Sequence, residues 1–597
     1  MSDLYQALAD TPTSPDAIFE AALQDYAAEN YEAAESACRR VVELVPAHSA
    51  AWHMLGVLAY ERDDYDGSLS CMEQALRFDP EHPVVYFNYG NALMGLKRFP
   101  EAVAAFRRAL EIDPTDQRFI HNLALALQKL GSPNAVEEAE TLLQRVVTLN
   151  PESAEAQANL GRFLRLLESS REDEAAEAFH RALELAPGAS AIRADLADMY
   201  EQMNLLDKAA AELEAGFAID PEYPDLYLVA AKLERRRGNL ENAIRNLKAL
   251  QASTKTGTYD RENHYESQMG LIRDAQGDTD AAFAHFAAAN AVMRSRWRPT
   301  EADINALPDR IRRLRSTFSP EWIASWSEDT SERDYRPPLF LIGMPRSGTT
   351  LLDTMLGAHG GFDVLEEKPT TIELFRAIDT LPGSSAAEPE GGLKELNSEQ
   401  FKTLRSTYFE TVDRYVQRRD DALLLDKNPF NILNAGIIYR VMPDAKFILA
   451  VRHPCDVVLS CFMQNFSRAA STLHFHDIVD AAKLYVQVMD LWRHYISILP
   501  IQYHRIRYED LVENTEAELR RLLAFAGAPW NDRALDHVDH ATSRGMIRNP
   551  SYHQVSRPVY REARFRWLRY RKQMEPVLEI LQPYIEYFGY PSPAESA

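Results

Sequence analysis

The sequence predicts two kinds of domain in one chain: an N-terminal solenoid of paired α-helices and a C-terminal α/β domain with a parallel sheet. Prolines recur at intervals of 34 residues, from Pro46 through Pro80 to Pro114. After the Pro-Pro dipeptide at 337–338, short apolar runs alternate with helical segments. The first of these runs leads into a glycine-bounded loop, residues 343–348. These three observations define the expected architecture.

The N-terminal half is expected to be a repeat array. Prolines at 151, 187 and 221 continue the period, with short insertions between them. In the unit at 49–82 the residues that match the repeat pattern are Trp52, Leu55, Gly56, Ala75 and Pro80. This half therefore resembles tetratricopeptide-repeat (TPR) proteins, with about eight units in residues 1–294. The resemblance implies a superhelix whose concave groove binds a protein or peptide.

Small and aromatic residues at fixed positions explain how such units would stack. Gly56, Gly90 and Gly161 would let the two helices of a pair approach closely, while Phe106 and Phe179 would fill the space between pairs. Charged residues on these helices are expected to lie mainly on solvated faces.

The charge is unevenly distributed along the chain. Of the net charge of −24, most lies in residues 1–330, which carry 33 basic and 54 acidic residues, against 32 and 35 in residues 331–597. An acidic half of this kind would repel nucleic acid, whose binding depends on neutralised phosphates. We therefore expect no nucleic-acid partner.

The remaining composition predicts a reduced, cytoplasmic protein. Four cysteines occur without metal-ligand spacing, so neither disulfides nor a metal site are expected. His474 and His476 lack other ligand types nearby, which argues against zinc. The N-terminus shows no secretory signal, and no apolar run has the length of a transmembrane segment.

Residues 295–337 are expected to connect the two domains. They contain Trp297, Trp322 and Trp326 and a basic helical stretch at 310–315. We expect these helices to dock the array against the next domain, which spans residues 338–597. The Pro-Pro dipeptide marks the boundary because proline neither continues a helix nor donates to a strand ladder.

The C-terminal domain should bind its ligand at one edge of a parallel sheet. Strands are expected at 339–342, 422–425, 446–451 and 503–507. Ligands on such sheets bind at the carboxyl ends of the strands. The candidate functional residues of this domain all follow strand ends.

The loop at 343–348 has the G-x-x-x-x-G spacing of a phosphate-binding turn. Its backbone N–H groups and the start of the following helix would point at a phosphate, and Arg346 would add a cation. Thr349 stands where a nucleoside triphosphatase has lysine, which disfavours a P-loop kinase. The sequence thus predicts a P-loop-like phosphate site of another kind.

A second phosphate site is expected after the strand at 446–451. Arg452 ends this strand, Pro454 opens a helix, and Ser460 lies about two turns along it. The guanidinium and the hydroxyl could bind one phosphate together, although Arg452 could instead pair with a structural carboxylate such as Asp456. Two separated sites suggest a ligand phosphorylated at two places.

These motifs resemble those of sulfotransferases that use 3′-phosphoadenosine 5′-phosphosulfate (PAPS), above all the tyrosylprotein sulfotransferase branch. The resemblance covers roughly residues 338–590 and implies PAPS as co-substrate, with no metal. For the 5′-phosphosulfate it implies Arg346, Ser347, Gly348, Thr349 and Thr350. For the 3′-phosphate and nucleotide it implies Arg452, Ser460, Tyr508 and Arg557.

Catalytic roles are implied in the same way. Glu367 matches the general base, with Glu366 as the near alternative, and Lys427 matches the lysine that stabilises the transferring sulfuryl group. Ser551 matches a transition-state serine. Each residue also has a structural reading as a solvated or ion-paired side chain, and the basic run at 544–572 is either a solvated helix or a lid over the nucleotide.

The leading hypothesis is a PAPS-dependent sulfotransferase whose repeat array docks the acceptor or a partner. The alternative is a TPR scaffold protein with a catalytically idle nucleotide-binding domain. A protein or peptide tyrosine is the acceptor that the resemblance favours, while small phenols, carbohydrates and lipids stay open. Oligomeric state has no signature in this sequence.

Overall fold

The computed structural model describes residues 14–130, 133–167, 171–255, 257, 260–297, 299–333, 335–385, 389–466, 471–543 and 563–591. The chain forms two compact units that divide between Ile192 and Arg193. Each unit is described by itself.

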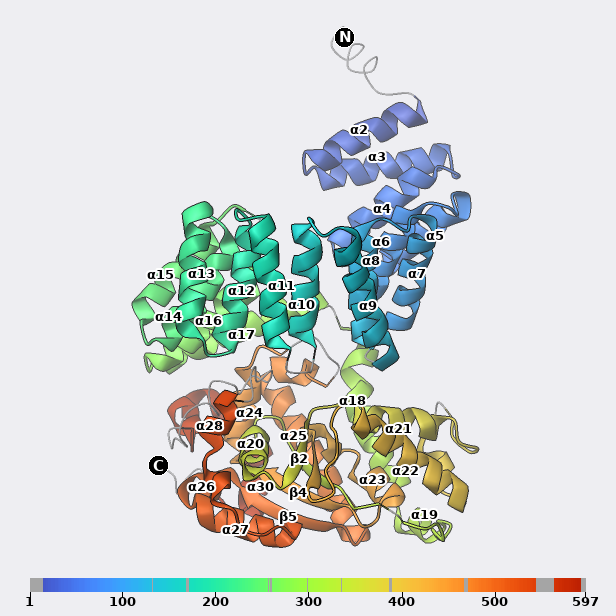
Figure 1. The fold of residues 1–597 in the computed structure, drawn as a ribbon. Helices are drawn as coiled ribbons and strands as arrows, with labels where there is room; N and C mark the ends of the chain where they lie inside the picture. Colours follow the sequence, from blue (N-terminus) through green and yellow to red (C-terminus); the bar gives the residue numbers. More distant parts are fainter. Residues whose placement is uncertain are drawn as a thin grey trace. The chain divides into compact units, whose positions relative to one another are not determined.

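The first unit consists of antiparallel helix pairs (Figure 1). Its helices are α2 (Pro15–Ala27), α3 (Tyr31–Leu44), α4 (Ser49–Glu61), α5 (Tyr65–Phe78), α6 (Pro83–Gly95), α7 (Phe99–Ile112), α8 (Gln117–Leu130), α9 (Pro133–Leu149), α10 (Ala154–Leu166) and α11 (Glu172–Leu185). Prolines open several of them, because a first-turn residue needs no backbone N–H for the helix ladder. The predicted helical solenoid is confirmed.

Close packing within the pairs follows the predicted glycine and phenylalanine positions. A methyl group built on Gly90 would lie 2.6 Å from the Phe106 ring, and one on Gly161 would lie 3.1 Å from the Phe179 ring. Apolar clusters then join each pair to the next, as where Ile18 and Val41 meet Ala51 of the following pair. Each pair therefore completes its core with its neighbour.

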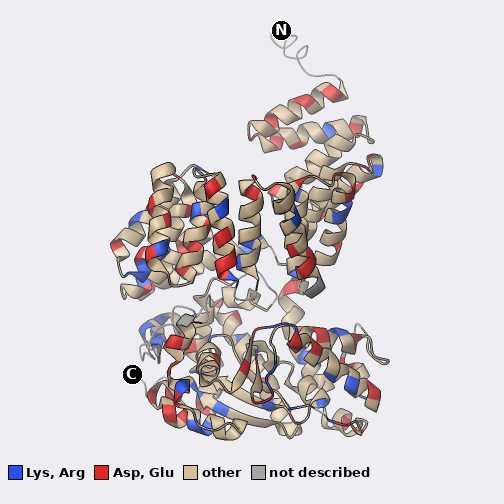
Figure 2. Ribbon diagram, viewed as in Figure 1, with Lys and Arg blue, Asp and Glu red and all other residues tan. Residues whose placement is uncertain are grey.

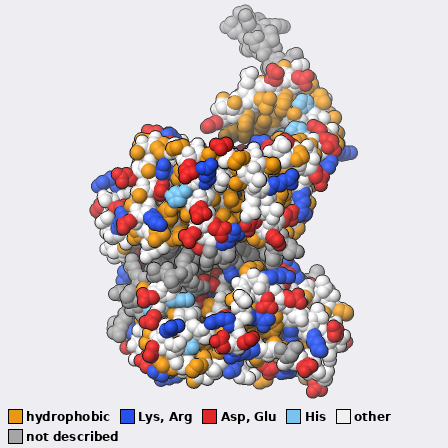
Figure 3. Space-filling view, in the orientation of Figure 1, with side chains coloured by type: hydrophobic (Ala, Val, Ile, Leu, Met, Phe, Trp, Pro, Cys, Tyr) orange, Lys and Arg blue, Asp and Glu red, His pale blue; other side chains and the backbone are white. Residues whose placement is uncertain are grey.

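The surfaces of the repeats carry many acidic residues and also exposed apolar side chains. In the ribbon of Figure 2, Asp and Glu positions, coloured red, occur along many of the repeat helices. Figure 3 shows hydrophobic side chains gathered over the N-terminal repeats, in the upper part of the view. Tyr31 and Leu44 of α3 are among the exposed large apolar residues.

The second unit begins with further helix pairs and continues into the α/β domain. The repeat helices are α12 (Ser190–Gln202), α13 (Leu206–Ile219), α14 (Pro224–Arg236), α15 (Leu240–Ala252), α16 (Arg261–Ala275) and α17 (Thr279–Trp297). The connecting helices are α18 (Glu301–Thr317), which starts with a Thr300–Asp303 capping box, and the short α19 (Pro320–Ala324). The division into domains at 294 and 337 stays a prediction.

The α/β domain is built on a five-stranded parallel sheet of order β2-β3-β1-β4-β5. The strands are β1 (Leu339–Gly343), β2 (Phe362–Glu366), β3 (Leu423–Lys427), β4 (Lys446–Val451) and β5 (Gln502–Arg507). Four of them fall where the sequence predicts strands. The prediction missed β2, an edge strand whose apolar run is interrupted by Asp363; Arg419 pairs with this carboxylate at 2.8 Å.

Helices cover both faces of this sheet (Figure 1). The helices are α20 (Thr349–His359), α21 (Thr370–Asp379), α22 (Ser398–Asp413), α23 (Ala435–Val441), α24 (Pro454–Phe462), α25 (Ile478–Ile498), α26 (Tyr508–Glu513), α27 (Thr515–Ala526), α28 (His537–Ser543) and α30 (Arg571–Tyr587). Short 3₁₀ turns lie at Pro389–Leu393, Pro429–Ile432, Leu473–His476, Asp532–Leu535 and Arg566–Tyr570. Successive residues of β1 belong to different cores, Phe340 to one and Leu341 to the other. Both faces are thus buried, as expected for parallel strands.

The connecting helices share the larger of these cores. Phe286 of α17 and Leu314 of α18 are buried in the same apolar cluster as Phe340. Phe318 belongs to the same cluster, and Trp322 and Trp326 pack edge to face against its ring and against each other. The last repeat helix and the connector are therefore continuous with the core of the α/β domain.

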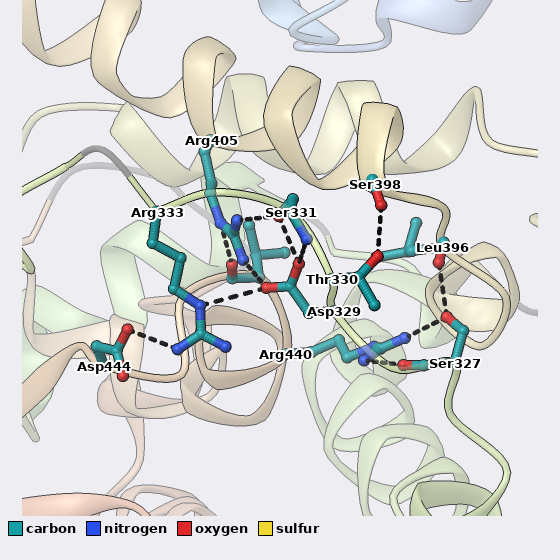
Figure 4. A network of polar contacts seen from close by, with 11 residues as sticks. Ser327, Asp329, Thr330, Ser331, Arg333, Leu396, Ser398, Arg405, Arg440 and Asp444 are labelled. Carbon is teal, nitrogen blue, oxygen red and sulfur yellow. Dashed lines mark hydrogen bonds and ion pairs between the residues drawn. The ribbon is translucent and has the colours of Figure 1, made fainter.

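The chain between α19 and β1 is held by a polar network over α22 and α23 (Figure 4). Asp329 accepts hydrogen bonds from Arg405 and Ser331, and its carboxylate lies 3.5 Å from Arg333 Nε. Arg440 donates to the carbonyl oxygen and the hydroxyl of Ser327, at 3.0 Å each. A buried guanidinium without hydrogen-bond partners would destabilise the folded state. These contacts therefore favour this one conformation of the segment.

Candidate functional site

The glycine loop follows β1 and ends at the start of α20. Gly348 is the N-cap of α20 with φ 100°, and Arg346 has φ 71°, a region that residues other than glycine rarely adopt. The Ser347 hydroxyl is buried and has no hydrogen-bond partner among the described residues. A buried hydroxyl beside the unpaired N–H groups of a helix start is a suitable site for an anionic oxygen.

Arg346 joins this loop to the second predicted phosphate motif. Its Nε donates to Ser460 Oγ at 3.1 Å, and Arg452 Nη1 donates to the Arg346 carbonyl oxygen at 3.3 Å. The two motifs are 114 and 106 residues apart along the chain at these contacts. They meet because β1 and β4 are neighbours, with Gly343 opposite Ala450.

Tyr508 lies against both motifs at the start of α26. The Arg452 guanidinium is 5.0 Å from the centroid of its ring. A methyl group built on Gly348 would lie 2.9 Å from the same ring, so this position requires glycine for space as well as for its positive φ. The ring therefore forms a wall beside the loop.

Arg452 also lies near Asp456, the carboxylate with which the sequence suggested it could pair instead. Its Nη2 lies 3.8 Å from Asp456 Oδ2 and donates to the Ala563 carbonyl oxygen at 2.6 Å. Burial raises the pKa of Asp456 to about 6, against the opposing effect of the Arg452 charge. The guanidinium is thus held in place by one weak ion pair and by backbone oxygens.

Lys427 forms the other half of the site, at the end of β3. Its Nζ lies 2.8 Å from Glu367 Oε1, 3.2 Å from Glu366 Oε1 and 3.2 Å from Asp353 Oδ2. The lysine and Asp353 side chains are 0% exposed. Burial opposes the charged ammonium, but the three carboxylates outweigh it and raise the pKa of Lys427. The lysine is therefore a permanently charged group at the sheet edge.

The two glutamates differ in exposure. The Glu367 side chain is 49% exposed and that of Glu366 is 20% exposed. Glu367 also adopts φ 52°, and its backbone N–H donates to the Lys427 carbonyl oxygen at 2.7 Å. Strained backbone of this kind is common in functional sites, where surrounding contacts maintain it.

Asp426 anchors the loop that carries these glutamates. Its Oδ2 accepts hydrogen bonds from Thr370 at 2.6 Å and from Tyr408 at 3.0 Å. Burial raises the pKa of Asp426 to about 6, although both hydrogen bonds lower it. Since strand residues alternate between faces, Asp426 fixes α21 on one side while Lys427 faces the carboxylates on the other.

The structure thus brings the predicted residues together in two groups. The first contains Arg346, Ser347, Gly348, Arg452, Ser460 and Tyr508, and the second contains Glu366, Glu367 and Lys427. Thr349 and Thr350 are buried in the first turn of α20. Ser551 and Arg557 lie outside the described residues, and their roles stay predictions.

Sequence reasoning missed Asp353, the buried partner of Lys427. It lies one turn beyond Thr349 in α20, which follows the glycine loop. The sequence did contain a signal for Asp353: it is an acidic residue among apolar neighbours, in the first helix after the glycine loop. Only the fold shows that it faces the end of β3.

Two cavities lie near the sheet. One of about 410 Å³ is lined by Asn428, next to Lys427 in the chain, and by Thr371 of α21. The Asn431 side chain, 1% exposed, also lines it, and its Nδ2 has no hydrogen-bond partner among the described residues. A larger cavity of about 800 Å³ is lined by residues at the opposite strand ends, such as Asp363 and Ala422. The smaller cavity is therefore adjacent to Lys427 along the chain, although none of the predicted site residues lines it.

Two features are absent from the described residues. No group of three or more His, Cys, Asp or Glu side chains there is arranged to hold a metal ion. None of the described helices is long and apolar enough to cross a membrane.

Comparison with protein families agrees with this architecture. A sulfotransferase family model matches residues 337–532. Tetratricopeptide-repeat models match residues 19–83, 53–117, 122–190 and 166–233.

Individual relatives are distant. An uncharacterized protein of Aquifex aeolicus is 28% identical over 52% of this chain and 40% of its own length. Protein-tyrosine sulfotransferase A of Caenorhabditis elegans is 26% identical over 39% of this chain and 61% of its own length. A solved tetratricopeptide-repeat protein of Parabacteroides merdae is 17% identical, with a TM-score of 0.36, over 45% of this chain and 99% of its own. The matches thus span 40% and 61% of the two sequence relatives. The family matches show that this protein joins an array of tetratricopeptide repeats to a domain of the sulfotransferase family.

Proposed function

We propose that the protein transfers a sulfuryl group from PAPS to a hydroxyl acceptor. The observation that carries this proposal is the contact between Lys427 and Glu367, at 2.8 Å, at the sheet edge that also holds the lysine-free glycine loop. This arrangement provides a cation and a carboxylate where a sulfuryl group would pass between donor and acceptor. The sulfotransferase family match supports the same reaction class.

The donor would occupy the first group of residues. Its 5′-phosphosulfate would lie on the N–H groups of the glycine loop, with Arg346 and the buried Ser347 hydroxyl as further donors. Its 3′-phosphate would lie at Arg452 and Ser460. Arg557 is proposed for the nucleotide as well, from the sequence resemblance alone.

In the reaction, the acceptor oxygen forms a bond to sulfur as the bond from sulfur to the 5′-phosphate oxygen breaks. Glu367 would take the acceptor proton, and its greater exposure favours it over Glu366 as the base. Lys427 and Arg346 would stabilise charge on the sulfuryl oxygens and on the departing phosphate. The leaving group is adenosine 3′,5′-bisphosphate.

Lys427 must change partners for this to happen. In the structure its ammonium is shared by three carboxylates, two of them at 3.2 Å. Moving Glu367 to the acceptor would free one of the three lysine N–H groups for a sulfuryl oxygen, while Asp353 and Glu366 keep the charge in place. The base and the stabilising cation would therefore be coupled.

A tyrosine of a protein or peptide is the acceptor we propose, with the repeat array docking it or a partner. Likeness to protein-tyrosine sulfotransferases supports the tyrosine, and the extended repeat surface supports a protein or peptide. The cavity beside Asn428 would receive the acceptor side chain.

Calorimetric titration of the purified chain with adenosine 3′,5′-bisphosphate tests the donor site. Absence of binding would refute the proposal. Transfer of labelled sulfate from PAPS in lysate fractions would then identify the acceptor. Binding without any transfer, together with unchanged biological activity of a Glu367→Ala, Lys427→Ala double variant, would support a scaffold with an idle nucleotide domain.

A further inference from the structure

The carboxylate of Asp274, near the end of repeat helix α16, holds one short segment of the α/β domain. Asp274 Oδ2 lies 2.6 Å from Arg566 Nη2, and Oδ1 lies 3.1 Å from Arg569 Nη2. The buried Tyr570 hydroxyl donates to Oδ1 at 2.6 Å. One side chain of the repeat array thus receives three donors from residues 566–570.

The same segment reaches the second phosphate motif. Arg452 Nη2 donates to the Ala563 carbonyl oxygen at 2.6 Å. The Trp567 backbone N–H donates to Asp456 Oδ1 at 2.8 Å, and its ring stacks on His453 with centroids 5.1 Å apart. Burial lowers the pKa of His453 to about 3, so this ring is neutral and stacks without charge. Residues 563–567 therefore contact Arg452, His453 and Asp456 and help to set their positions.

Helix α17, the partner of α16 in this pair, also holds the end of α24. Asn290 Nδ2 donates to the Phe462 carbonyl oxygen at 2.9 Å, and the rings of Phe283 and Phe462 stack at 4.7 Å. Phe462 lies two residues beyond Ser460, which contacts Arg346. The last helix pair therefore supports the phosphate motif from two directions.

We infer that Asp274 is a positioning residue of the donor site, through which the last repeat controls the binding of the nucleotide 3′-phosphate. This inference rests on the proposed function. The path runs from the Asp274 carboxylate to Arg566, Arg569 and Tyr570, and from their segment to Arg452 through the Ala563 carbonyl. A guanidinium that binds phosphate by a planar fork depends on its orientation, so loosening this segment weakens the interaction.

The test compares Asp274→Asn with Asp280→Asn in the full-length chain. Asp280 makes a similar contact from α17 to α30, an ion pair at 3.2 Å with Lys572, but both side chains are largely exposed. Binding of adenosine 3′,5′-bisphosphate and of adenosine 5′-monophosphate is measured by calorimetry. For Asp274→Asn we expect Kd for the bisphosphate to rise about three- to thirtyfold, the range for residues that act at a distance, with little change for the monophosphate.

The two ligands separate positioning from general stability. If Asp274 had only a structural role, its substitution would raise Kd for both nucleotides alike, and this result would overturn the inference. An unchanged Kd for the bisphosphate would overturn it as well. Asp274→Glu keeps the charge and should restore part of the affinity. If wild-type protein binds neither nucleotide, the proposed function itself fails, and the inference fails with it.

A milder variant covers the case in which Asp274→Asn does not fold. Arg569 is half exposed and donates to the same carboxylate, so Arg569→Gln removes one of its three partners. We expect a rise of about threefold in Kd for the bisphosphate, the lower end of the same range. No rise in this variant would contradict the inference.

Discussion

The backbone N–H of Glu367 donates to the carbonyl oxygen of Lys427 at 2.7 Å, and the same residues meet again through their side chains at 2.8 Å. The double contact joins the end of β2 to the end of β3, 60 residues further along the chain. It places the proposed base next to the proposed cation in the structure. A substitution of either residue is therefore expected to alter the position of the other.

Replacing Lys427 should destabilise the fold because Asp353 would remain as a buried charge. We expect Lys427→Met to lower the free energy of unfolding by about 3–5 kcal/mol, the usual effect of breaking a buried ion pair. Urea unfolding at pH 7 measures this. The Lys427→Met, Asp353→Asn double variant should recover much of the loss, and a double variant as unstable as the single one would contradict this account.

The two glutamates can be distinguished by matched amide substitutions. Glu367→Gln should lower the rate of transfer about 10²- to 10⁴-fold, as for loss of a general base, while Kd for adenosine 3′,5′-bisphosphate stays close to that of wild type. Glu366→Gln should lower the rate much less. Rates are measured with labelled PAPS and the acceptor found by labelling. A larger loss for Glu366→Gln would assign the base to that residue.

Arg452 should be selective for the nucleotide 3′-phosphate. We expect Arg452→Gln to raise Kd for adenosine 3′,5′-bisphosphate about tenfold or more, because hydrogen bonds to charged groups contribute about 1.5–3 kcal/mol. Affinity for adenosine 5′-monophosphate should change little. Arg505→Gln, an exposed change on neighbouring β5, serves as the control. If the substitution raised Kd equally for both nucleotides, Arg452 would not be a contact of the 3′-phosphate.

Stability should depend on pH through Asp426. Its pKa is about 6 in the folded protein, above the ordinary value of 3.8, so the folded state binds this proton more tightly than the unfolded state. Its contribution to stability is complete below pH 3.8 and is lost as pH rises to about 6 and above. The Asp426→Asn variant lacks this carboxyl, so its unfolding free energy loses this part of the pH dependence.

The measurement is the difference in unfolding free energy between Asp426→Asn and wild type from pH 4 to pH 8. We expect the variant to gain up to about 3 kcal/mol relative to wild type as pH rises. Asp456, whose pKa is also raised to about 6, titrates in both proteins and cancels in the difference. A difference that does not vary with pH would contradict the prediction.

Two glycines of the repeats should respond differently to alanine. At Gly56 the added methyl group would meet the flexible end of Met72 at 2.8 Å, and at Gly90 it would meet the rigid Phe106 ring at 2.6 Å. Alanine favours a helix over glycine by about 1 kcal/mol, which should offset the contact at Gly56. Gly90→Ala should lower the free energy of unfolding by about 1–3 kcal/mol, as in overpacked cores. Thermal unfolding of both variants checks the difference, and equal losses would contradict it.

Local patterns in the sequence were sufficient for the main features of the fold. The 34-residue period, the helix-breaking prolines and the glycine loop are short-range signals, and each predicts its own element without knowledge of the rest. For the same reason the prediction found four strands but missed β2, where Asp363 interrupts an apolar run. The strand, turn and helix that carry each predicted phosphate motif were likewise expected from local patterns, while phosphate binding itself stays a prediction.

The order of a helical array and an α/β domain, and the residue types that follow the strand ends, can be read from the sequence alone. Which side chains meet in space depends on the folded structure. Asp353 lies beside Lys427, and Asp274 beside Tyr570, across separations of 74 and 296 residues. Such contacts depend on strand order and helix packing, which arise from the burial of apolar surface over the whole unit rather than from any local pattern.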